Sequence, residues 1–358
     1  MLQPLSLPNA YALSQLLPGD PFAVHAYLFV AGAGNALIDP LPLDGAAHGQ
    51  IAELGGIARV VVMTPSRRRT GDEIAARYGA EVIAAPAHRE ALFAGARAIR
   101  LEHQRRPNEF AVSVADDGIV VAGDSLFGSP AGALSMPPDS EYPDARKAAL
   151  GLRAILRENP DTLFLSFGQP IFTGAYAALY RLLYARAGAE VHRINVDELD
   201  VRDERAERVE QPRIYHIRDA EVGFAIGARR LGYRVSTVGP GQRFCPLHAH
   251  AREEELFFVL EGEPSVRTLA GTIRCRKGDF VALPVGESGT HQLINESDAP
   301  ATVILLARNE DVEACYYPDS DKLLMDTDVP LKDDRRSLMV AASPELDYFH
   351  GEDPPPPL

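Results

Sequence analysis

Two histidines one residue apart, followed by a cluster of glutamates, are the residues of this sequence best suited to chemistry. They lie in the stretch CPLHAHAREEELFFVLEG, residues 245–262. Side chains alternate between the two faces of a strand, so His248 and His250 point the same way if they share one strand. A short bend after His250 would bring Glu255 to the same side. Neutral imidazoles with a carboxylate suit Fe, Mn, Ni, Cu or Zn, so the stretch predicts part of a site for one metal ion.

This stretch and a second one further along resemble the two motifs of the cupin family. The residues that match are Gly241, His248, His250, Glu255 and Gly262 in the first motif, and Gly278, Asp279, Pro284, Gly286, His291 and Asn295 in the second. The resemblance covers about residues 212–325. Gly286 and His291 stand further apart than is usual in the family.

The cupin resemblance implies a jelly-roll β-barrel with one metal inside. By the match to the motifs, the ligands would be His248, His250, Glu255 and His291. The metal would be one divalent transition metal: Fe, Mn, Ni, Co, Cu or Zn. A cupin barrel can also persist as a packing unit without metal, but all the ligand types are present here, which favours a bound ion.

Three neighbouring side chains leave alternatives open. Glu253 and Glu254 precede Glu255, and the choice among the three glutamates depends on the strand register. We interpret the first two as solvated loop charges. Cys245 could approach the metal, but we favour a small buried thiol in a strand.

The predicted site leaves coordination positions open for dioxygen or for a substrate oxygen. Cupin enzymes of this type include dioxygenases, isomerases, decarboxylases and lyases, and the family also contains binding and storage proteins. We therefore expect a mononuclear metalloenzyme of dioxygenase, isomerase or lyase type that acts on a small organic metabolite. The alternative is a non-catalytic metallo-cupin sensor or ligand-binding protein, because a fold does not settle a function.

The elements that would position this site are short strands. From Pro212 onward, apolar runs alternate with Gly, Pro or Asn-Asp punctuation, which favours a sandwich or barrel. The predicted strands are YRVSTVG, LFFVLEG, SVRTLAG, TIRCRKGD, FVALPVG, THQLIN and ATVILLA.

The first half of the chain alternates between strand and helix patterns. AYLFVAG and NALIDP predict a hairpin, and IARVVVMT predicts a strand buried on both faces. GDEIAARYG predicts a helix that ends at Gly79. Further helices are predicted from about Pro143 to Glu158 and over GAYAALYRLLYARAG. This order predicts a layered α/β domain.

The α/β half resembles the metallo-beta-lactamase fold over about residues 20–185. In active members a threonine is followed by His-x-His-x-Asp-His, but here Thr64 is followed by PSRRRT. The position of a later histidine ligand is Phe167, and only Asp124 matches a bridging-ligand position. Arginine does not ligate metals, so we predict a degenerate domain without hydrolytic activity that serves as a scaffold, dimer surface or regulator.

The arginines in this degenerate region allow three interpretations. We favour a structural ion pair of Asp124 with Arg67 or Arg69 across the former metal cleft. The second interpretation is an anion-binding pocket for phosphate or carboxylate, formed by Arg67, Arg69 and Asp124. The third is a solvated basic loop. His25 and His88 are interpreted as isolated surface or packing histidines.

The composition limits the classes of partner. The chain has 358 residues, enough for two domains, and a net charge of -14, which argues against nucleic acid as a partner. No apolar run of about 18 residues suggests a membrane span. Three cysteines argue against a disulfide framework. We expect a cytoplasmic protein with a small-molecule substrate or ligand and, by the cupin resemblance, a homodimer.

We therefore predict an α/β layered metallo-beta-lactamase-like domain followed by an all-β cupin jelly-roll barrel. The first domain would span residues 1–188 and the cupin domain residues 212–350. Residues 189–211 are predicted as a linker because DELDVRDERAERVEQ is almost purely charged. The tail GEDPPPPL, residues 351–358, is predicted to be disordered.

Overall fold

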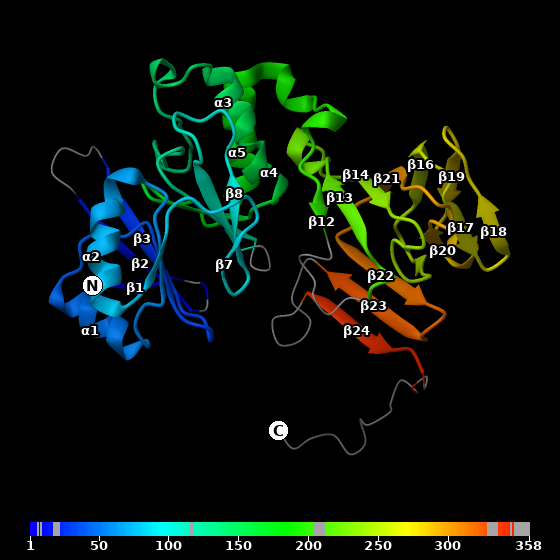
Figure 1. The fold of residues 1–358 in the computed structure, drawn as a ribbon, viewed down its shortest axis with the longest axis horizontal. Helices are drawn as coiled ribbons and strands as arrows, with labels where there is room; N and C mark the ends of the chain where they lie inside the picture. The colour runs from blue at the N-terminus through cyan, green and yellow to red at the C-terminus, as the bar shows by residue number, and fades with distance from the viewer. Residues whose placement is uncertain are drawn as a thin grey trace. The chain divides into compact units, whose positions relative to one another are not determined.

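The computed structural model describes residues 1–5, 7, 9–16, 22–114, 118–203, 212–327, 336–343 and 346. The chain divides into two compact units, each shown in Figure 1. The first comprises Met1–Arg193 with the short segment Phe224–Gly227, and the second comprises Ile194–Gly223 and Ala228–Leu358. Within the described residues, no helix has both the length and the apolar character needed to span a membrane.

One sheet of the first unit has six strands in the order β1-β2-β3-β4-β5-β6. The first four strands are antiparallel, and β4, β5 and β6 are parallel. The predicted hairpin is confirmed, because β3 pairs with β4. The strands are β1 (Gln3–Pro4), β2 (Ala10–Gln15), β3 (Val24–Phe29), β4 (Ala36–Ile38), β5 (Arg59–Val61) and β6 (Glu81–Ile83).

The other sheet of the first unit has five strands in the order β11-β10-β9-β8-β7. Only β10 and β11 pair in parallel. The strands are β7 (Ala91–Phe93), β8 (Ala96–Arg100), β9 (Phe110–Val114), β10 (Ile119–Ala122) and β11 (Thr162–Leu165).

Five α-helices are described in the first unit. They are α1 (Gly45–Glu53), α2 (Arg68–Tyr78), α3 (Ala145–Gly151), α4 (Arg153–Arg157) and α5 (Ala175–Ala187). The 3-10 helices of this unit are η1 (Pro65–Arg67), η3 (Asp139–Glu141), η4 (Gly188–His192) and η6 (Phe224–Ile226).

The first unit is built in four layers, helix-sheet-sheet-helix, as Figure 1 shows. An apolar core fills the space between the sheets, where Tyr27 of β3 stacks on Phe164 of β11 with ring centroids 4.9 Å apart. The outer face of the six-stranded sheet buries Ile51 of α1 and Ile74 of α2, and the outer face of the five-stranded sheet buries Leu179 of α5. This arrangement confirms the layered α/β prediction, because each sheet has one face against its helices and one against the other sheet.

Helix ends in this unit follow local chemistry in one case and tertiary contact in another. The helix α2 ends at Gly79, whose φ of 67° is the left-handed conformation that glycine adopts without strain, as predicted. The single helix expected from Pro143 to Glu158 is instead divided into α3 and α4. At the break, the backbone of Gly151 approaches the carbonyl of Glu102 so closely that no side chain would fit.

A buried arginine stands at one of the positions after Thr64 where the resemblance would place a metal ligand. Arg67 is 6% exposed, and its guanidinium donates to the carbonyl oxygens of His25, Asp39 and Ser166 at 2.5, 2.6 and 3.0 Å. Its Nη1 also lies 3.3 Å from the Asp39 carboxylate, and its Cζ lies 4.9 Å from the centre of the Phe167 ring. The Arg67 cation is therefore packed among three carbonyl oxygens, the Asp39 carboxylate and the Phe167 ring.

The second unit contains three antiparallel sheets. The six-stranded sheet has the order β12 (Arg202–Asp203), β13 (Ile217–Glu221), β14 (Leu231–Val238), β21 (Ala301–Arg308), β16 (Glu255–Glu261) and β19 (Phe280–Leu283). The three-stranded sheet has the order β18 (Gly271–Arg274), β17 (Ser265–Thr268) and β20 (His291–Ile294). The four-stranded sheet has the order β15 (Ala249–His250), β22 (Val312–Tyr317), β23 (Lys322–Thr327) and β24 (Ser337–Ala341).

Alternating apolar residues from these strands form the core of the second unit. Phe257 and Val259 of β16 and Val303 and Leu305 of β21 are buried, and Leu293 of β20 packs with them. The period of two places every second side chain inside, which is why the short runs in the sequence were recognisable as strands.

Part of the predicted linker over residues 189–211 is ordered. Its described portion contains all of η4 except Gly188, and then η5 (Val196–Glu198). It also contains β12, which pairs with β13 of the second unit. Residues 204–211 lie outside the described residues, as do residues 351–358 of the predicted tail. The linker and the tail therefore stay predictions.

The Arg67 contacts predict a large effect on the stability of the first unit. Arg67→Met should lower its free energy of unfolding by about 3 kcal/mol, because Asp39 and three carbonyls lose a buried cationic partner. Arg69→Met is the matched control: its side chain is 90% exposed in a pair with Glu73, and its loss should cost about 0.5 kcal/mol or less. Urea unfolding of the full chain measures both. Equal effects of the two variants would contradict a packing role for Arg67.

The burial of His25 predicts a pH dependence. Burial, opposed by its hydrogen bond to Gly168 and aided by the charge of Arg67, lowers the pKa of His25 below the ordinary 6.5. The unfolded chain then binds the proton more tightly, so this histidine stabilises the fold above about pH 6.5 and loses that contribution as the pH falls through the folded-state pKa. His25→Gln should make the acid-induced fall in melting temperature of the first unit shallower, as measured by calorimetry. Identical slopes for the variant and the wild type would contradict the assignment.

Candidate metal centre

Three strands carry three of the four predicted ligands of the second unit, and the fourth, His248, lies just before one of them. His250 lies on β15, Glu255 is the first residue of β16, and His291 is the first residue of β20. His248 precedes β15 and pairs with His291 through two backbone hydrogen bonds, His248 N to His291 O at 3.1 Å and His291 N to His248 O at 2.9 Å. This backbone pair brings together the two halves of the motif, which are far apart in sequence.

The side chains of the four residues converge. Their ligand atoms all lie within 4.8 Å of one another. The Nε2 atoms of His248 and His250 are 3.0 Å apart, and Glu255 Oε2 lies 3.4 Å from His250 Nε2 and 2.9 Å from His291 Nε2. The structure therefore brings His248, His250, Glu255 and His291 into one cluster.

Backbone carbonyls orient two of the imidazoles. His248 Nδ1 donates to Pro246 O at 2.9 Å, and His291 Nδ1 donates to Gly289 O at 2.8 Å. A carbonyl oxygen only accepts, so in each ring the proton belongs on Nδ1 and the lone pair of Nε2 points into the cluster. This is how histidines that hold a metal are usually supported.

The cluster is electrostatically incomplete without a cation. Imidazole lone pairs and a carboxylate face one another across about 3 Å, which is repulsive unless a positive charge lies among them. Glu255 Oε2 is buried and receives no hydrogen bond of acceptable geometry, although a histidine nitrogen is close. An orphaned buried carboxylate oxygen is rare in proteins, and a metal ion would satisfy it.

The pKa shifts in the cluster reflect this crowding. Burial, with the charges of His291 and His250, lowers the pKa of His248 to about 4. Burial opposes the charged form of His250, but contacts with Cys315 and Glu255 outweigh it and raise its pKa to about 10. Burial would raise the pKa of Glu255, but His250 and His291 hold it well below its usual range. The carboxylate of Glu255 thus favours a positive charge within the cluster.

The strand register decides which glutamate faces the cluster. Glu255 points inward on β16, whereas Glu254 is exposed as expected. Glu253 is half-buried rather than solvated, and its Oε2 lies 3.7 Å from His250 Nδ1, on the far side of that ring from the cluster. Cys245, expected as a buried strand thiol, lies in a bend with Sγ 3.6 Å from His248 Nδ1.

Two residues near His250 had no counterpart among the sequence predictions. Cys315 Sγ lies 3.3 Å from His250 Nδ1, and Glu313 Oε1 lies 3.6 Å from the same atom. Both belong to β22, whose residue Cys315 is directly opposite His250. The only sequence signal was the alternation of EACYY in a strand outside the two motifs, which does not indicate a partner.

Aromatic rings cover the cluster. The edge of the Phe257 ring faces His291 with centroids 5.3 Å apart, and Tyr317 stacks on His248 with centroids 5.7 Å apart. These rings, with the low exposure of His248 and His291 at 8% and 1%, give the cluster an apolar and largely dry surrounding. Electrostatic interactions are strong in such surroundings.

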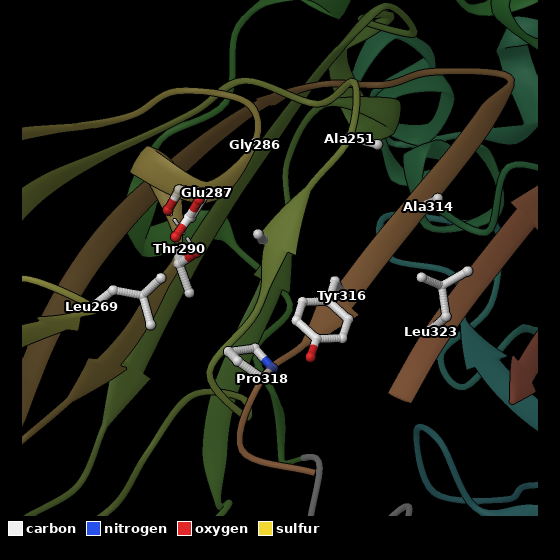
Figure 2. Close-up of a pocket in the computed structure, with 10 residues that line it drawn as sticks. Ala251, Leu269, Gly286, Glu287, Thr290, Ala314, Tyr316, Pro318 and Leu323 are labelled. Atoms are coloured by element: carbon white, nitrogen blue, oxygen red, sulfur yellow. Dashed lines mark hydrogen bonds between the residues drawn. The ribbon is translucent and has the colours of Figure 1, made fainter. Parts of the chain in front are cut away.

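A pocket of about 500 Å³ lies on the other face of the same strands. Figure 2 shows it lined by Ala314, Tyr316, Leu323 and Leu269. Side chains alternate along β22, so Ala314 and Tyr316 face this pocket while Cys315 faces His250. The pocket is therefore separate from the histidine cluster.

The candidate anion site of the first unit is not formed. Arg67 is buried among backbone carbonyls, whereas the Arg69 side chain is 90% exposed and bonded to Glu73. The expected pairing of Asp124 with Arg67 or Arg69 is wrong. Asp124 instead accepts from Arg105 at 2.8 Å and from Arg106 at 2.6 Å.

The partners of Asp124 come from the loop that follows β8. Arg105 also bonds Glu141 at 2.7 Å, so this aspartate is part of a mixed ion-pair network. The prediction failed because the pairing of this loop with Asp124 joins segments that share no local sequence pattern. His25 is a packing histidine, as expected, bonded to Ser14 Oγ and Gly168 O.

Comparison with known protein families finds a match in each half of the chain. The family description "Cupin domain" matches residues 234–307, and "Metallo-beta-lactamase superfamily" matches residues 2–184. No curated protein matches the chain.

Three solved structures are similar to parts of this chain. A cupin-superfamily sugar phosphate isomerase from Silicibacter pomeroyi is 22% identical, with 42% of this chain and 92% of that chain covered and a TM-score of 0.36. A metallo beta lactamase from Erythrobacter litoralis is 15% identical, with 51% and 89% covered and a TM-score of 0.40. A polyketide cyclase from Streptomyces resistomycificus is 20% identical, with 33% and 79% covered and a TM-score of 0.28.

The match over residues 2–184 spans just over half of the 358 residues, and it coincides with the four-layered first unit. The match over residues 234–307 contains all four residues of the histidine cluster. The chain belongs to the metallo-beta-lactamase superfamily and carries a cupin domain in its second half.

Proposed function

We propose that the cupin domain holds one divalent transition metal ion and that the chain is a mononuclear metalloenzyme for a small organic metabolite. The ligands would be His248, His250, Glu255 and His291. One observation carries the proposal: Glu255 Oε2 is buried, receives no hydrogen bond, and lies 2.9 Å from His291 Nε2. A divalent ion satisfies all four ligand atoms, and Fe, Mn, Ni, Co, Cu and Zn each accept such a donor set.

A bound metal of this kind would supply Lewis-acid chemistry or dioxygen activation. The chain's own residues would shield the site from water and orient its ligands. Phe257 and Tyr317 exclude water beside His291 and His248, and the backbone carbonyls of Pro246 and Gly289 hold two of the ligands in place. This surrounding favours an enzyme of dioxygenase, isomerase or lyase type, because exclusion of water strengthens the electrostatic interactions of such a site with its substrate.

We also propose that the sheets of the second unit are walls of a cupin jelly-roll barrel. The β20 strand pairs with β17 on one side. On its other side it makes the backbone bridges Arg243–Ile294 and His248–His291. The segment that makes these bridges continues into β15, which belongs to the four-stranded sheet. Shared strands of this kind support a continuous wall around the metal ligands.

The expected homodimer is part of the same proposal. One face of the four-stranded sheet presents Val312, Tyr316 and Val340, which are 41%, 40% and 40% exposed. Exposed apolar side chains on one face favour protein contact. The mass of the chain in solution decides whether a second copy covers this face.

Metal content tests the proposal directly. After chelation and reloading with Mn²⁺, Fe²⁺, Co²⁺, Ni²⁺, Cu²⁺ or Zn²⁺ in separate samples, we expect one equivalent per chain for at least one ion, measured by elemental analysis. His248→Ala with His250→Ala should abolish binding, because only two ligands remain. His216→Ala, which removes a histidine of the same unit bonded to Asp203, should keep it. A wild-type chain that takes up none of these ions would refute the proposal.

Substrate panels test the enzymatic part. With Fe²⁺ bound, we expect oxygen uptake or substrate loss with at least one compound among catechols, thiols, β-diketones and sugar phosphates, and none in the double histidine variant. A panel without any turnover would favour the ligand-binding alternative. Hydrolysis of a chromogenic lactam should be absent, because Arg67 and Phe167 stand at positions where the metallo-beta-lactamase resemblance places metal ligands. Hydrolysis that persists in the double variant would contradict this account of the first unit.

A further inference from the structure

We propose that Glu313 and Cys315 are positioning residues for His250 and thereby set the metal affinity of the centre. The inference rests on the proposed function and extends it to residues outside the two cupin motifs. It starts from a difference among the three histidines of the cluster.

His250 is supported differently from the other two rings. The Nδ1 atoms of His248 and His291 meet backbone carbonyls, at 2.9 and 2.8 Å. The Nδ1 atom of His250 instead meets side chains, with Cys315 Sγ at 3.3 Å and Glu313 Oε1 at 3.6 Å. His250 is therefore the ligand whose Nδ1 lies against both a carboxylate and a thiol, whereas Nδ1 of His248 lies against a carbonyl, with the Cys245 thiol more distant at 3.6 Å.

Strand pairing holds these partners behind the ring. His250 of β15 lies directly opposite Cys315 of β22, and Glu313 faces the same way two residues earlier. Glu313 and Cys315 are both 5% exposed, so their contacts with His250 are shielded from water. The Nε2 atom of His250, at the other end of the ring, is left to point toward Glu255, 3.4 Å away.

Glu313 also fixes the turn between two ligands. Its carboxylate accepts the backbone N–H groups of Ala251, Arg252 and Glu253 at 2.8, 3.1 and 3.0 Å. These residues connect His250 to Glu255, so one buried side chain sets the approach of both ligands. A carboxylate with three backbone donors is rigid, because each donor restricts its rotation.

Outer partners of this kind orient a ligand and raise its basicity, and their loss typically weakens metal binding roughly 10–100-fold. Cys315→Ala removes the thiol contact, and Glu313→Gln removes the charge while keeping one acceptor oxygen. Cys275→Ala is a matched control, because Cys275 is also 5% exposed in the same unit but contacts Ile273 O instead of a histidine.

The experiment is a Co²⁺ titration of the full chain against a chromophoric chelator. We expect roughly 10–100-fold weaker binding for Cys315→Ala and for Glu313→Gln, wild-type binding for Cys275→Ala, and recovery of most of the affinity in Cys315→Ser, whose hydroxyl can accept from Nδ1. The d–d absorption of bound Co²⁺ should shift in Cys315→Ala and not in Cys275→Ala.

The outcomes separate this inference from the proposed function. A wild-type chain that binds no Co²⁺ overturns both. A wild-type chain that binds one equivalent, with Cys315→Ala and Glu313→Gln unchanged, overturns only the positioning role. A sulfur-to-cobalt charge-transfer band, or a second equivalent of Co²⁺ that Cys315→Ala removes, also overturns it, because Cys315 would then be a ligand itself.

Discussion

The second unit depends on one electrostatic constraint, the convergence of three imidazoles and one carboxylate in an apolar interior. Like lone pairs at about 3 Å repel, so the arrangement needs a cation, and it needs a scaffold that prevents the side chains from turning away. Backbone pairing of His248 with His291 supplies one part of that scaffold. The pairing of β15 with β22 supplies the other, since it places Cys315 and Glu313 behind His250.

In the first unit the buried positive charge belongs to a side chain of the protein itself. Arg67 stands at a sequence position where the metallo-beta-lactamase resemblance places a metal ligand, and its guanidinium donates to the carbonyl oxygens of His25, Asp39 and Ser166. A covalently attached cation cannot be lost or exchanged. Its buried contacts with three carbonyl oxygens and the Asp39 carboxylate stabilise the fold around it.

The faces of β15 and β22 have separate roles. One face carries His250, Cys315 and Glu313, and the other lines the pocket of Figure 2 with Ala249, Ala314 and Tyr316. The alternation of side chains in a strand makes this division possible with very few residues.

The sequence by itself determined the features that depend on local spacing. The approach of His248 to His250, the helix stop at Gly79, the alternating strands of the second half and the loss of metal ligands after Thr64 are all visible within a few residues. Only the tertiary structure decided that Glu255 faces the cluster and that Asp124 pairs with Arg105 and Arg106. The same holds for the contact of Cys315 with His250. These contacts join segments distant in sequence, and sheet register and burial choose them, whereas a periodic pattern reports only which face of its own element a residue occupies.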